Sequence, residues 1–75
     1  MTQTYLEMTA NELAMEAVIF DIDIADDPML LMAHLRRKRP NFHTFCMELP
    51  IQDWDTVREM AESKYNRTCR LAAQL

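Results

Sequence analysis

The sequence predicts an all-α protein, a small bundle of three to four helices that forms a single domain over residues 1–75 and is completed by self-association. Glycine is absent, and glycine supplies the positive φ angles of tight β-hairpin turns, so a sheet built from hairpins is not expected. Three prolines instead separate segments whose apolar residues recur at helical spacing. A chain of this length buries only about 60% of the surface that its unfolded form exposes, so a second copy would add useful core.

A first helix is expected over residues 10–24. Thr9 followed by Glu12 has the spacing of a capping box, in which the threonine side chain caps the helix and the glutamate reaches back. One face then carries Leu13, Ala17, Phe20 and Ile24. Most of the other positions are apolar too, which predicts a helix with protein on nearly all sides.

Residues 18–24 also alternate between apolar and polar side chains, as a strand would. The capping pattern before them and the missing hairpin glycine favour the helix over the strand.

Two shorter helices are expected in the middle of the chain. Asp27-Pro28 combines an N-cap with a proline at the first helical position, which predicts a helix over residues 28–38. Asn41 is expected to cap a third helix that ends before Pro50. Its apolar stripe is spaced i, i+3, i+4, i+7 and consists of Phe42, Phe45, Cys46 and Leu49.

The last helix is expected to start at Asp53 or Asp55 and to continue to about Gln74. Its length of ~31 Å matches the ~29 Å diameter of a compact domain of this size, so its far end should project or lie against a second chain. We therefore expect a partner interface on the first and last helices, made by Phe20, Ile24, Trp54, Val57, Ala61, Tyr65, Leu71 and Leu75. Trp54 is the only tryptophan, and we expect it to anchor the core or this interface.

The most prominent charged feature is a basic run that consists of Arg36, Arg37, Lys38 and Arg39. In one hypothesis these side chains contact the phosphates of a nucleic acid. The net charge of −4 opposes approach to a polyanion, and the segment that follows is too apolar to read base edges. We favour a second hypothesis, in which the run complements a helix C-terminus and meets the acidic first helix of another molecule. Residues 1–30 carry seven acidic side chains and no basic one.

No catalytic motif, cofactor or metal site is expected. The lack of glycine removes the phosphate-binding loop and the dinucleotide fingerprint. His43 and Cys46 form the only closely spaced pair of metal-ligand types, and the apolar stripe around Cys46 favours a buried, reduced thiol.

The chain is expected to reside in the cytoplasm and not in a membrane. Two cysteines are too few for a secreted disulfide scaffold, and the first residues lack the pattern of a signal peptide. These observations together predict a non-enzymatic protein-interaction or regulatory module that forms homo-oligomers and binds an unknown protein partner. Small accessory proteins of phages and plasmids are commonly of this kind; the alternative is a small nucleic-acid-binding regulator that uses the basic run.

Overall fold

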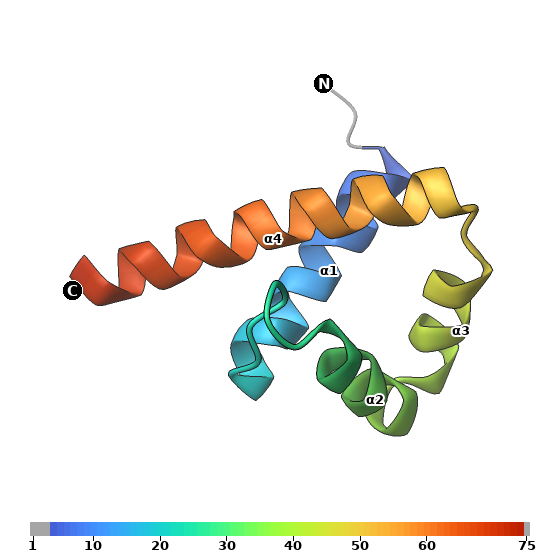
Figure 1. The fold of residues 1–75 in the computed structure, drawn as a ribbon, viewed down its shortest axis with the longest axis horizontal. Coiled ribbons are helices and arrows are strands. Elements are labelled where there is room, and N and C mark those ends of the chain that lie inside the picture. The colour runs from blue at the N-terminus through green and yellow to red at the C-terminus, as the bar shows by residue number, and fades with distance from the viewer. Residues whose placement is uncertain (1–3, 75) are drawn as a thin grey trace.

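The computed structural model describes residues 4–74, and the side-chain surroundings of residues 4–72. This part of the chain contains helices and no strand, which confirms the all-α class. The helices are α1 (Tyr5–Phe20), α2 (Pro28–Lys38), α3 (Pro40–Glu48) and α4 (Ile51–Gln74). Figure 1 shows α4 crossing α1, with α2 and α3 side by side below the start of α4.

Helix α1 begins at Tyr5, so the predicted start at residue 10 is wrong. The side chain of Thr4 accepts a hydrogen bond from the Glu7 backbone N–H at 3.2 Å. Thr9 lies inside the helix, and its hydroxyl donates to the Tyr5 carbonyl at 2.7 Å. Thr4 and Glu7 have the same capping-box spacing as Thr9 and Glu12, and the earlier of the two patterns starts the helix.

Helix α1 ends at Phe20, so the predicted extension to residue 24 is also wrong. Asp21 adopts a left-handed conformation (φ 56°, ψ 47°), which aspartate tolerates better than most residues. The Ile22 N–H donates to the Ala17 carbonyl at 2.9 Å, the bond of a Schellman motif. No strand forms over residues 18–24 either, because residues 22–27 make a loop in which the Asp23 carboxylate accepts a hydrogen bond from the Ala25 N–H at 2.9 Å.

The second helix has the predicted bounds, with Pro28 in its first turn. Asp27 makes no side-chain capping bond there, contrary to the prediction. Helix α3 begins at Pro40 rather than after Asn41, because a proline fits the first helical position without losing a hydrogen bond.

Helix α4 begins at Ile51, earlier than predicted, and the Trp54 N–H donates to the Pro50 carbonyl at 2.9 Å. Its 24 residues span ~36 Å, and the longest dimension of the molecule is 37 Å. The helix is therefore as long as the whole molecule, and Figure 1 shows its C-terminal end extending past α1.

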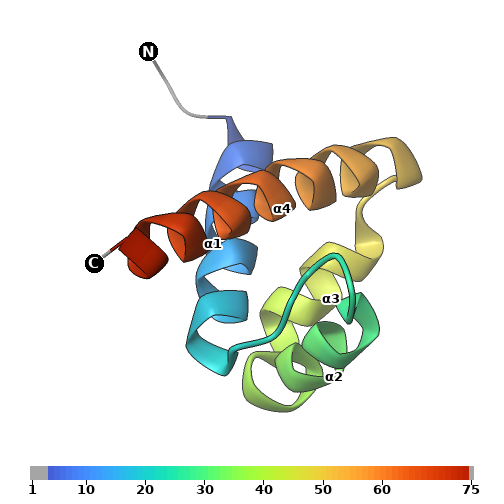
Figure 2. The same cartoon turned by 60° about the vertical axis from the view of Figure 1, so that its left-hand side comes forward.

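The core lies between α1, α4, α2 and the loop that joins α1 to α2. Small residues line the crossing of α1 and α4, which both views show (Figures 1 and 2); Ala10, Ala17 and Ala61 are fully buried, so the two helices can approach closely. The buried apolar cluster consists of Ala10, Leu13, Ala14, Ala17, Ile22, Ile24, Leu31, Leu35, Val57, Ala61 and Tyr65. None of the helices within residues 4–74 is both long and apolar enough to cross a membrane.

Candidate interaction surface

The predicted interface residues fall into three groups. Four of them are buried in the core of their own chain: Ile24, Val57, Ala61 and Tyr65. Phe20 and Trp54 are half-buried at the edge of the same core, and the Phe20 ring lies 4.9 Å from that of His34. Leu71 is exposed, whereas Leu75 lies outside the described residues. The first two thirds of the α4 stripe therefore pack on α1 of the same chain.

The exposed apolar side chains of α1 gather on the opposite face of that helix. We name this face the α1 ridge and define it by Met8, Met15, Val18 and Ile19, all of which are exposed. The sequence pattern predicts a helix that is apolar on nearly all sides, but periodicity does not say which face the same chain covers. Four of the predicted interface residues instead lie in the core that α1, α2, α4 and the loop between α1 and α2 form together.

Beside the α1 ridge, α1 and α4 diverge and leave an open hollow of about 500 Å³. We call it the wedge. Its lining consists of Asn11, Ala14, Met15 and Val18 from α1, and of Lys64, Arg67 and Thr68 from α4. One wall is thus mostly apolar and the other is basic, and none of the described residues that line the hollow carries a carboxylate.

The C-terminal part of α4 has little cover from its own chain. Residues 66–72, which we call the overhang, are all exposed. They include the apolar Leu71 and the basic Arg67 and Arg70. The overhang continues the helix face that is buried at Val57 and Ala61, so an apolar surface extends beyond the chain's own core.

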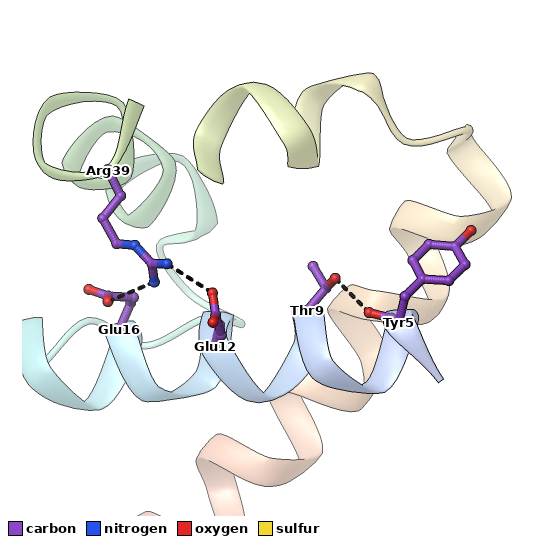
Figure 3. A network of polar contacts seen from close by, with 5 residues as sticks. All are labelled: Tyr5, Thr9, Glu12, Glu16 and Arg39. Carbon is purple, nitrogen blue, oxygen red and sulfur yellow. Dashed lines mark hydrogen bonds and ion pairs between the residues drawn. The ribbon is translucent and has the colours of Figure 1, made fainter. Parts of the chain in front are cut away.

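Arg39 leaves the basic run and turns toward α1. Its Nη2 lies 2.9 Å from Glu12 Oε2, and its Nη1 lies 3.2 Å from Glu16 Oε1, as Figure 3 shows. The guanidinium carbon also lies 4.6 Å from the centre of the Phe42 ring. Arg39 therefore joins the α2–α3 connection to α1, and the acidic first helix that it meets is that of its own chain.

Replacing Arg39 with alanine should lower the free energy of unfolding by about 1–2 kcal/mol, because two partly exposed ion pairs and one stacking contact are lost. Urea denaturation at low salt measures this loss, which should shrink in 1 M NaCl as screening weakens the ion pairs. The matched control is Arg37→Ala, since Arg37 is exposed and makes no ion pair among the described residues. Equal effects of the two substitutions would contradict the role given to Arg39.

The other three basic residues of the run, Arg36, Arg37 and Lys38, remain exposed at the end of α2. Arg36 and Arg37 line a shallow hollow together with His43. Helix α3, which follows, presents Phe45 and Met47 to solvent. A phosphate could meet this patch, but these apolar side chains do not read base edges.

The predicted burial of Cys46 is confirmed. The residue is almost completely buried, and this burial raises the pKa of its thiol to about 11. A metal ligand must be a thiolate, so a raised pKa opposes metal binding at this position. Within the described part of the chain, no three potential ligands come together in a group that could hold a metal ion.

Comparisons with protein-family models, with curated proteins and with solved structures found no match. The α1 ridge is the face of α1 on which exposed apolar side chains gather, and the wedge and the overhang lie beside it.

Proposed function

We propose that this protein is a non-enzymatic protein-interaction module that associates with a second copy of itself through the α1 ridge. The observation that supports this most directly is the ridge itself. Met15 is 62% exposed and Ile19 is 64% exposed, on a helix whose other faces already pack against α4 and α2. Contiguous apolar surface of this kind marks interaction sites on small proteins.

The accessible surface supports the same proposal. It measures 5508 Å², whereas a compact monomer of 8.9 kDa should expose ~4,800 Å². The chain therefore exposes ~700 Å² more than a compact monomer of its mass. A standard interface buries about 800 Å² on each partner, which is of the same order.

Charge and composition favour a protein partner over a nucleic acid or a reaction. The basic run supplies three exposed cations rather than four, because Arg39 is engaged with Glu12 and Glu16. The wedge lining offers no acid–base pair and no nucleophilic thiol or serine. We extend the proposal to a regulatory or accessory role in the cytoplasm, which the low cysteine content supports.

Met15→Glu should convert the dimer into a monomer of 8.9 kDa at micromolar concentration. The substitution places a charge in an apolar contact, which should raise the dimer dissociation constant by at least ~10-fold. Sedimentation equilibrium measures the dissociation constant, and circular dichroism shows whether the helices persist. The matched control is Met29→Glu, because Met29 is 85% exposed and lies on α2, away from the ridge.

A wild-type chain that sediments as a monomer up to millimolar concentration and melts cooperatively would overturn the proposal. A dimer that persists unchanged in Met15→Glu would move the interface away from the α1 ridge. Nanomolar, sequence-specific binding to a nucleic acid in physiological salt would favour the basic patch instead.

A further inference from the structure

We infer that two copies place their α1 ridges face to face and parallel, about a two-fold axis that runs along α1. This inference rests on the proposed self-association and adds the orientation of the two chains and the pairing of their charges. Three features of the described residues lead to it: the spacing of the ridge, the charges on its two borders and the direction of the overhang.

Three residues of the ridge and the neighbouring Asn11 have the spacing of a coiled-coil seam. Met8, Asn11, Met15 and Val18 follow one another at intervals of three, four and three residues. Asn11 is half-buried and lies on the wedge side of this seam. In a parallel pair it meets Asn11 of the second copy, so the two amides can bond to each other. In an antiparallel pair centred on the ridge it would oppose a residue near Met15 or Glu16, and such a mismatch is disfavoured.

The two borders of the ridge carry opposite net charges. On one side two carboxylates, those of Glu12 and Glu16, meet the single guanidinium of Arg39, and the Glu12 side chain is 51% exposed. Lys64 and Arg67 lie on the other side, in the wall that α4 contributes. Figure 3 shows Arg39 reaching α1 from one side, while the ribbon of α4 crosses behind α1 and its later turns continue on the other side.

The symmetry of the dimer decides which borders meet. A two-fold axis along α1 exchanges left and right, so the basic border of each copy faces the acidic border of the other. A two-fold axis across α1 would place the basic borders together and the acidic borders together. Like charges at close range oppose association, so the charges select the parallel arrangement.

The overhang begins on the basic side of the ridge, because Arg67 lines the wedge together with Lys64. Figure 1 shows the end of α4 extending past α1. Arg67 and Arg70 would then lie near the acidic border of the partner, where Glu12 is exposed. Leu71 would gain apolar cover that its own chain does not supply, since it is exposed in the single chain.

Cysteine cross-linking tests the orientation. The exposed Cys69 is first replaced by serine, whereas Cys46 is buried and stays in place. Met8→Cys should then form a disulfide-linked dimer under mild oxidation, because parallel ridges bring the two copies of residue 8 together. Met29→Cys, at an exposed site away from the ridge, serves as the control and should remain uncross-linked.

An antiparallel dimer would give the opposite pattern. Met8→Cys alone would stay uncross-linked, and only its mixture with Ile19→Cys would form the disulfide, which would overturn the inference. A dimer by sedimentation with neither cross-link would also overturn it while leaving the proposed self-association intact. A monomeric wild-type chain would instead remove the proposed function, and the inference with it.

A charge reversal gives a second test whose sign depends on the orientation. In the parallel dimer Arg67→Glu places acid against acid and should raise the dissociation constant about 2- to 10-fold at low salt. In the antiparallel dimer it would relieve a clash of bases and lower that constant. Arg58→Glu, at an exposed position of α4 outside the wedge, is the control and should leave the constant unchanged.

Discussion

Leu35→Ala should lower the free energy of unfolding by about 2–5 kcal/mol, the range for a leucine that leaves a cavity in a core. Leu35 has an exposed fraction of 0% and lies in the middle of the buried cluster, on α2. A domain of 75 residues has a total stability of only ~4–11 kcal/mol. The variant should therefore be largely unfolded in modest urea, as followed by circular dichroism at fixed protein concentration.

Leu30→Ala is the matched control for this prediction. The residue lies on the same helix and loses the same atoms, but it is 49% exposed. Its loss of stability should stay below ~1 kcal/mol, because less apolar surface returns to water. Equal losses for the two variants would mean that α2 does not dock on α1 with Leu35 inward.

The sequence predicted the middle of the chain better than its first third, and the reason is local. Pro28 fixes the start of α2, and the bounds of that helix are confirmed. For α1, two capping boxes lie five residues apart, and periodicity could not choose between Thr4 and Thr9. Helix α1 ends where Asp21 adopts a left-handed conformation. Glycine is the usual residue at such a position, and the sequence has no glycine there to indicate the end of the helix.

The candidate site was harder to predict, because it depends on which apolar face the chain covers by itself. The stripe through Val57 and Ala61 was correctly placed on one face of α4, but the fold presses that face onto α1. Arg39 illustrates the same limit. Its partners Glu12 and Glu16 lie 27 and 23 residues away in the chain, and only the tertiary fold brings them together.

Raising the pH from 8 to 11 should remove about 2 kcal/mol of stability through Cys46 alone. Burial raises the pKa of this thiol from 9.0 to about 11 in the folded chain, so folding favours the neutral form. The stability that comes from the neutral thiol is fully present below pH 9. It is lost as the pH rises from 9 through 11, at up to ~1.4 kcal/mol per pH unit. Burial also raises the pKa of Tyr65, to about 12, which adds a loss in the same direction at still higher pH.

The part that belongs to Cys46 can be isolated by comparing two alanine variants in urea denaturation at pH 8 and pH 11. Cys46→Ala has no thiol to ionise in the core, so its stability should fall by about 2 kcal/mol less than that of the wild type over this range. Cys69→Ala removes an exposed thiol and leaves Cys46 in place. The stability that this variant loses through Cys46 between pH 8 and pH 11 should equal the loss in the wild type. If Cys46→Ala and Cys69→Ala lose the same stability between the two pH values, the Cys46 thiol ionises as easily in the folded chain as in the unfolded one. The burial of the Cys46 side chain, which excludes water from that thiol, would then be contradicted.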